Sequence, residues 1–164
     1  KRMTDIIFKW DGTLDKFVGD EIMVFWGAPA TQEDHAERAV RCAIDMSERL
    51  DELRQEWRLR GVEGLDCGIG INSGEVIIGN IGAAGKKMDY TVIGDNVNLA
   101  ARVEKLTREY GSRILITENT LQHIEPGIQG GRLGHVEIRD LASVRVKGKE
   151  QEVRIYSVIG LKHE

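Results

Sequence analysis

The stretch YTVIGDNVNLAAR, residues 90–102, decides the fold because its hydrophobic pattern changes from that of a strand to that of a helix. The β-branched residues 91–93 predict a strand, Gly94 predicts a break, and Asp95 or Asn96 suits the N-cap of a helix. A strand therefore runs directly into a helix at this point.

Asn98 and Arg102 stand four positions apart on that helix, so they share one face. Arginine presents a planar fork of hydrogen-bond donors, and asparagine offers both a donor and an acceptor. Such a pair suits an anion or the sugar-phosphate of a nucleotide. By spacing alone, a capped amphipathic helix with a polar solvent face is the commoner meaning, and that alternative stays open here.

Two further blocks accompany this stretch: GTLDKFVGDEIMVF at residues 12–25 and VRVKGKE at residues 144–150. The first resembles the metal-binding hairpin of class III nucleotidyl cyclase catalytic domains, and the second is similar to their C-terminal phosphate-contacting segment. Residues 89–102 resemble the signature segment of the same family. The blocks follow the family's order and extend the resemblance over nearly the whole chain.

Length and pattern predict one domain of the α+β class. The chain has 164 residues, of which 41% are hydrophobic, enough for one substantial core. Strands and helices interleave in mixed order with several hairpin turns, which predicts a largely antiparallel mixed sheet. The resemblance implies a ferredoxin-like βαβ-type core, the nucleotide cyclase fold, over residues 1–164. It also implies that the family's N-terminal strand and part of its first helix are missing.

Hydrophobic periodicity predicts the remaining elements in order. We expect a first helix ending at Trp10 and a long amphipathic helix from about residue 36 to residue 57. A further expected helix is short, ends at His123 and is followed by a turn at residues 126–127. The expected strands are 13–18, 21–26, 65–72, 75–81, 113–116, 133–140, 142–147 and 152–159, with 65–72 and 75–81 joined as a pair through residues 73–74.

Charge and cysteine usage exclude several classes of partner. The formal net charge is −4 with acids and bases interspersed, which predicts neither a nucleic-acid surface nor a basic membrane-binding surface. We find no signal peptide and no apolar run long enough to span a membrane. Cys42 and Cys67 are expected to be small core residues. Without a disulfide framework the pattern favours a cytoplasmic location, although a full-length protein could be membrane-attached.

The resemblance implies a reaction at two divalent metal ions, Mg²⁺ or Mn²⁺, held by two carboxylates over a nucleotide triphosphate. The ribose 3'-hydroxyl then attacks the α-phosphate, and a 3',5'-cyclic nucleotide and pyrophosphate result. Asp20 matches one metal carboxylate, whose plainer interpretation is a hairpin aspartate. The second metal aspartate belongs to the missing N-terminal strand and is absent from this chain, which leaves the activity of the chain by itself open.

The resemblance assigns the nucleotide contacts to five residues. Lys16 and Thr91 match positions that read the purine, Asn98 the residue that orients the ribose, Arg102 the one that stabilises charge at the reacting phosphate, and Lys147 the terminal-phosphate contact. The Lys-with-Thr pairing resembles a subgroup of ATP-using, often bicarbonate-stimulated members. A solvated lysine and a β-branched strand residue are the plainer interpretations of Lys16 and Thr91.

In the family, one subunit supplies the metal aspartates and the other supplies the remaining contacts, so this chain is expected to form a homodimer with shared sites. We therefore expect an adenylate cyclase catalytic domain acting on ATP in signal transduction, with an upstream regulatory domain. A guanylate cyclase and a non-catalytic dimerisation or nucleotide-sensing module are the alternatives.

Overall fold

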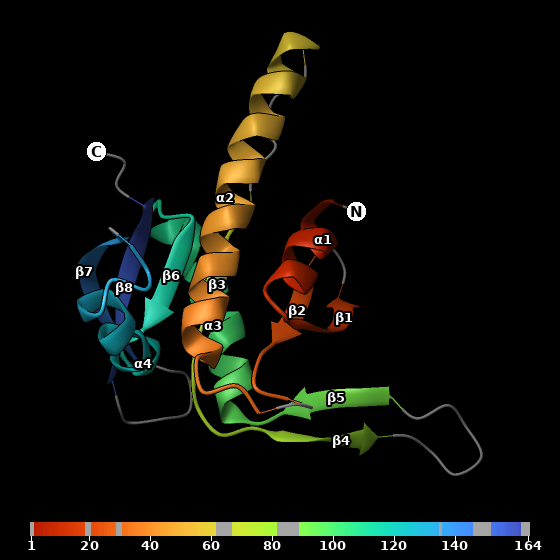
Figure 1. The fold of residues 1–164 in the computed structure, drawn as a ribbon, viewed down its shortest axis with the longest axis vertical. Coiled ribbons are helices and arrows are strands. Elements are labelled where there is room, and N and C mark those ends of the chain that lie inside the picture. The colour runs from red at the N-terminus through yellow and green to blue at the C-terminus, as the bar shows by residue number, and fades with distance from the viewer. Residues whose placement is uncertain are drawn as a thin grey trace.

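The computed structural model describes residues 2–18, 21–28, 31–61, 67–81, 89–134, 136–145 and 152–161. Figure 1 shows how these residues are arranged. The elements in chain order are α1 (Arg2–Lys9), β1 (Thr13–Val18), β2 (Glu21–Phe25), α2 (His35–Leu59), β3 (Ile69–Ile71), β4 (Ile77–Ile81), β5 (Asp89–Ile93), α3 (Asp95–Glu109), β6 (Ile114–Thr117), α4 (Glu118–Gln129), β7 (Val136–Arg145) and β8 (Glu152–Leu161).

A four-stranded sheet with the order β3-β6-β8-β7 forms the centre of the molecule. Strand β3 pairs with β6 in parallel, and the other two pairings are antiparallel. Two separate antiparallel ribbons, β1–β2 and β4–β5, complete the described strands. The predicted α+β class with a largely antiparallel mixed sheet is confirmed.

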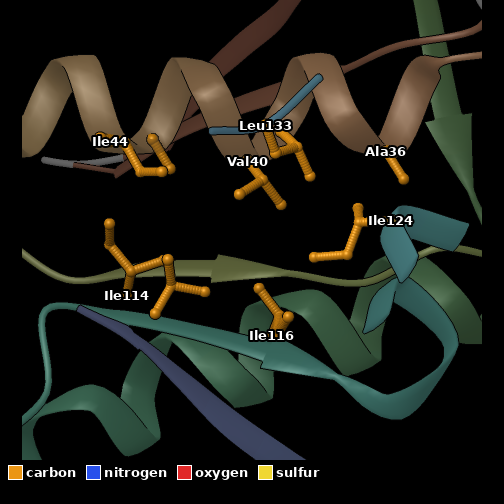
Figure 2. Close-up of a cluster of buried hydrophobic side chains, with 9 residues drawn as sticks. Ala36, Val40, Ile44, Ile114, Ile116, Ile124 and Leu133 are labelled. Atoms are coloured by element: carbon orange, nitrogen blue, oxygen red, sulfur yellow. The ribbon is translucent and has the colours of Figure 1, made fainter. Parts of the chain in front are cut away.

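Strand β6 is buried on both faces, and this places helices on both sides of the sheet. Ile114 and Ile116 face α2 and α4, whereas Leu115 belongs to a second cluster under α3. Figure 2 shows the first cluster, with residues of α2 directly opposite those of β6. Each Leu or Ile buried in this way contributes roughly 1.5–3 kcal/mol relative to exposure. The first cluster comprises Ala36, Val40, Ala43, Ile44, Ile114, Ile116, Ile124, Leu133 and Val158.

The first helix ends where the sequence predicted, in a Schellman motif. The backbone N–H of Gly12 donates to the carbonyl of Ile7 at 2.9 Å, and that of Asp11 donates to the carbonyl of Phe8 at 3.0 Å. Asp11 has a φ of 61°, the left-handed conformation that this motif requires. The chain therefore turns sharply from α1 into β1.

The β1–β2 ribbon is anchored to helices rather than to the central sheet. The indole N–H of Trp26, just after β2, donates to the carbonyl of Trp10 at 2.9 Å. The indole of Trp10 in turn donates to Asp45 Oδ2 on α2 at 2.6 Å. In Figure 1 this ribbon and α1 lie on one side of α2, and β6, β7 and β8 lie on the other.

The predicted pairing of residues 65–72 with 75–81 is wrong. Strand β3 pairs with β6 in the register Ile69↔Ile114, and β4 pairs with β5 in the register Ile77↔Ile93. The polar residues after β3 form hydrogen bonds with other elements instead of closing a hairpin. Residues 65–66 of the predicted strand lie outside the described residues.

Two boundaries near the C-terminus also differ from prediction. Helix α4 does not end at His123 but continues through Pro126 to Gln129, because Ile124 and Ile128 pack against the first core cluster. Parts of the predicted strands 133–140 and 142–147 form one strand, β7, with shifts in register near Ile138 and near Leu141. Such bulges keep pairing with β8 on either side. Residues 135, 146 and 147 of these predictions lie outside the described residues.

The two cysteines have different environments. Cys42 is fully buried, as predicted, but Cys67 is exposed and precedes β3, so its predicted core position is wrong. Burial, and secondarily the charge of Asp45, raises the pKa of the Cys42 thiol to about 12. At pH 8 only about one molecule in ten thousand then carries the reactive thiolate at this position.

We expect an aromatic disulfide reagent at pH 8 to modify Cys67 in the native protein and to leave Cys42 unmodified until the protein unfolds. The absorbance of the released thiolate measures both phases. In the Cys67→Ser variant the fast phase should disappear. Two thiols that react at equal rates in the native protein would contradict the buried position of Cys42.

Candidate nucleotide-binding site

Helix α3 presents one apolar face to the core and one polar face to the surface. Leu99, Val103 and Leu106 are buried in the second cluster. Asn98 and Arg102 are exposed on the same helix. Because the apolar residues fix the rotation of the helix, the amide and the guanidinium face outward together. The predicted N-cap at Asp95 or Asn96 is wrong, because Gly94 occupies that position without a side-chain bond. An amphipathic helix with a polar outer face agrees with both interpretations left open above, so the roles of Asn98 and Arg102 stay predictions.

The two predicted base-reading residues belong to strands that contact each other. Lys16 lies in β1 and Thr91 in β5, and β1 contacts β5. Strand β5 leads through Gly94 directly into α3. The side chain of Thr91 lies outside the described part of the chain, so only its strand position is known.

The Lys16 side chain lies close to a buried carboxylate. Its Nζ is 4.0 Å from Asp15 Oδ2, and the Asp15 side chain is 2% exposed whereas that of Lys16 is 46% exposed. A shift in the pairing register between Leu14 and Lys16 accompanies this arrangement. The buried acid therefore sits next to a cation that extends toward solvent.

Two predicted site residues, Asp20 and Lys147, lie outside the described residues. Asp20 follows β1 by two positions in the sequence, and Lys147 follows β7 by two positions. Their predicted roles stay predictions. Within the described part of the chain, no group of three or more His, Cys, Asp or Glu residues could hold a metal ion.

Close packing between β3 and α3 explains the glycine at position 70. A Cβ atom on Gly70 would lie 2.4 Å from the backbone nitrogen of Glu104 and 2.8 Å from the carbonyl oxygen of Ala100. Helix α3 thus rests directly on β3, and only glycine fits between them. This contact positions the helix that carries Asn98 and Arg102.

Sequence reasoning missed a set of amide hydrogen bonds at the start of α3. Asn96, which was expected to be a possible cap, donates instead to the carbonyl of Glu75 and accepts a bond from Asn72. The available signal was Gly74, because a Cβ atom there would lie 2.4 Å from Asn96 Nδ2. A glycine between two polar segments can thus mark a buried amide contact.

A carboxyl pair connects α3 with the β1–β2 ribbon. Burial raises the pKa of Glu104, and a hydrogen bond with Glu21 on β2 raises it further. The nearby cations Arg108 and Lys105 oppose this shift. Because burial and the neighbouring Glu21 disfavour the charged form of Glu104, protonation of Glu104 favours the contact between helix and ribbon.

The chain has clear relatives among known proteins. The family model described as adenylate and guanylate cyclase catalytic domain matches residues 2–160. Adenylate cyclase 1 of Rhizobium meliloti (strain 1021) is 30% identical over 158 residues, which is 96% of this chain and 22% of that protein. The chain therefore spans less than a quarter of that relative's length.

Solved structures resemble the fold closely. The adenylyl cyclase CyaB from P. aeruginosa matches with a TM-score of 0.83 and 39% identity, over 98% of this chain and 78% of that one. The guanylyl cyclase Cya2 matches with a TM-score of 0.81 and 38% identity, over 98% of this chain and 76% of that one. None of the helices in the described residues is both long enough and apolar enough to cross a membrane.

We expect Glu104→Gln to raise the melting temperature at pH 7.5, because a glutamine keeps a hydrogen bond to Glu21 without a buried charge. A carboxyl with a raised pKa stabilises the folded state only while it is protonated, so this stability is lost as pH rises from the ordinary value of 4.5 through the folded-state pKa. The gain from Glu104→Gln should therefore shrink toward pH 4. Thermal unfolding between pH 4 and pH 8 measures it, with the exposed Glu109→Gln as the matched control. A gain that is equal at all pH values would contradict the raised pKa of Glu104.

Proposed function

Because the chain belongs to the family of adenylate and guanylate cyclase catalytic domains, we propose that it is the catalytic domain of an adenylate cyclase. It converts ATP to 3',5'-cyclic AMP and pyrophosphate. The observation that carries this proposal is the exposed pair Asn98 and Arg102 on α3, next to the contacting strands that hold Lys16 and Thr91.

In the proposed reaction the ribose 3'-oxygen forms a bond to the α-phosphorus while the bond from that phosphorus to the bridging oxygen of pyrophosphate breaks. Asn98 holds the ribose through its amide and orients the hydroxyl for attack. Arg102 donates to the oxygens of the α-phosphate, where negative charge accumulates. Preorganised donors of this kind can lower a barrier by about 3–4 kcal/mol.

Recognition of the base falls to Lys16 and Thr91 in this proposal, and Lys147 contacts the terminal phosphate. An ammonium is a donor only, so Lys16 suits the acceptor N1 of adenine. Guanine presents a donor at the same ring position, which the lysine cannot satisfy. The arrangement therefore favours ATP over GTP.

Members of this family use divalent metal ions. We propose two ions, Mg²⁺ or Mn²⁺, per site, with Asp20 as one ligand, because carboxylate oxygen is the donor that these hard cations prefer. The ions would lower the cost of the developing alkoxide and neutralise charge on the phosphates. The described residues do not form a metal site by themselves, so the roles given to Asn98 and Arg102 include no step at the metal.

Exposed apolar pairs on both ribbons support a homodimer. Phe17 lies opposite Ile22 on β1–β2, and their exposures are 61% and 38%. Ile77 lies opposite Ile93 on β4–β5, with exposures of 68% and 44%. Apolar side chains clustered on a surface mark interfaces, and a second copy would cover them. The two copies share each site, with Asp20 from one and Arg102 from the other.

A guanylate cyclase is the second candidate. The likeness to the guanylyl cyclase Cya2, at 38% identity, is nearly as high as the likeness to CyaB. Lys16 argues for the adenine base, and named adenylate cyclases are among the relatives.

The substrate ATP and two cysteines outside any disulfide suit a cytoplasmic location.

We expect the protein, with the N-terminal strand that the resemblance implies included, to form cyclic AMP from ATP and Mn²⁺. Arg102→Ala and Asp20→Ala should each abolish activity. An equal mixture of the two variants should recover about a quarter of wild-type activity, because half of the dimers are mixed and each contains one intact site. Product analysis by liquid chromatography measures this recovery. A mixture as inactive as its components would contradict the shared site.

We expect Lys16→Glu to reduce the preference for ATP over GTP by at least about tenfold, since a carboxylate accepts from the guanine ring nitrogen and repels the adenine one. The ratio of kcat/KM for the two nucleotides measures the preference. The exposed Lys105→Glu is the control for an added negative charge. An unchanged ratio would remove Lys16 from base recognition.

A further inference from the structure

The first turn of α3 is held by a side chain that points away from the proposed active site. Asn96 Nδ2 donates to the carbonyl of Glu75 at 2.8 Å, in the segment between β3 and β4. Asn98, two positions further along the helix, is exposed. Residues two positions apart on a helix point in roughly opposite directions, so the anchoring amide and the proposed ribose-binding amide lie on opposite sides of the same turn.

Asn72, directly after β3, forms two hydrogen bonds with this turn. Its Nδ2 donates to the carbonyl oxygen of Asn96 at 3.0 Å and to Asn96 Oδ1 at 3.1 Å. Both targets are acceptors, so the NH₂ group of Asn72 must face them. Asn96 is fixed in the same way, because the carbonyl of Glu75 requires its NH₂ group. Neither amide can be reversed without placing one acceptor against another.

The opposite side of Asn72 is tied to the buried part of the sheet. Asn72 Oδ1 accepts a hydrogen bond from Thr117 Oγ1 at 2.7 Å. Thr117 ends β6, has no exposed surface and also caps α4 by accepting from Thr120 N. Asn72 therefore joins the first turn of α3 to a rigid point of the core, where β6 meets α4.

The neighbouring Ser73 and Gly74 support the same contact. Ser73 Oγ lies 2.9 Å from Thr120 Oγ1, and both hydroxyls are buried. A Cβ atom on Gly74 would lie 2.4 Å from Asn96 Nδ2, so glycine leaves the space that the amide fills. The segment after β3 is thus shaped around Asn96.

We propose that Asn72, acting through Asn96, is a positioning residue that sets the direction of Asn98 and Arg102. The first N–H groups of a helix have no i→i−4 partner, and Val97 N and Asn98 N both donate to the carbonyl of Gly94, at 3.2 Å each. The amides of Asn72 and Asn96 hold the first turn of α3, which has little support from backbone hydrogen bonds. This inference rests on the proposed function for its effect on catalysis.

A structural role alone would have different consequences from a positioning role. Lost hydrogen bonds lower the melting temperature in either case. Only misplaced reacting groups lower kcat in protein that is still fully folded, and a displacement near 1 Å can cost about a hundredfold. KM should change little, because the base and the terminal phosphate are held by other elements. The split between kcat and KM therefore separates the two roles.

The experiment compares Asn72→Ala, Asn96→Ala and the double variant in the dimeric protein, at a temperature well below each melting transition. We expect each single variant to lower kcat by at least about tenfold with KM for ATP within about threefold of wild type. The double variant should be no worse than the single ones, because the two amides act as one unit. Asn119→Ala, an exposed asparagine in the first turn of α4, is the matched control and should have wild-type kcat.

Unchanged kcat in folded Asn72→Ala, or losses that simply add in the double variant, would overturn the inference. Amide hydrogen exchange of residues 96–98 provides a readout without catalysis and should be faster in Asn72→Ala than in Asn119→Ala. If the wild-type protein forms no cyclic nucleotide, the proposed function fails. The exchange rates then decide alone: faster exchange confined to this turn supports the positioning role, and unchanged exchange rejects it.

Discussion

The contact between helix α3 and strand β3 is the constraint on which the rest of the structure depends. At Gly70 the two backbones approach so closely that one added carbon would lie 2.4 Å from a helix nitrogen. The apolar face of α3, with Leu99 and Val103, is buried on the same side of the sheet. Once that face is fixed, Asn98 and Arg102 can only face outward. Packing at Gly70 therefore sets the rotation of α3 as a whole, and the amides of Asn72 and Asn96 then hold its first turn.

The two ribbons are supported differently from the central sheet. An isolated two-stranded ribbon is marginally stable in water. The β1–β2 ribbon is anchored to α1 and α2 through Trp10 and Trp26, and it contacts β5. The apolar outer side chains of both ribbons remain exposed in a single copy. The proposed base-reading residues thus lie on the two ribbons, whose exposed apolar side chains a second copy would cover. Asn98 and Arg102 lie on α3, which is held by the core of a single copy.

Local sequence signals predicted the elements well and their pairing less well. The change of period at Gly94 and the end of α1 near Trp10 both follow from residue chemistry within a few positions. The pairing of β3 with β6 depends on contacts between residues 45 positions apart, Ile69 and Ile114, which no local pattern encodes. Two strands that lie close together in the sequence usually form a hairpin. Here β3 instead forms its hydrogen bonds with β6, and β4 forms its hydrogen bonds with β5.

The same contrast between local signals and long-range contacts applies to the candidate site. The outward face of α3 could be predicted from spacing, because it depends on a single helix. The amide contact of Asn72 with Asn96 could not, since it joins segments 24 positions apart and its only local trace is Gly74. The exposed position of Cys67 was missed because the strand was expected to begin at residue 65, whereas Cys67 precedes β3, which begins at Ile69.

Charge explains why the proposed chemistry needs more than one copy of the chain. The net charge is −4, and the ammonium of Lys16 already has the carboxylate of Asp15 4.0 Å away. A nucleotide triphosphate brings several more negative charges to this surface. Exposed cations are screened by water and salt, so Lys16 and Arg102 alone attract such a ligand weakly. In the proposed dimer, Asp20 of one copy would hold metal ions near Arg102 of the other, in a partly enclosed site. Positive charge is then concentrated where the phosphates lie and the dielectric is lower, which an isolated, net-negative domain does not achieve.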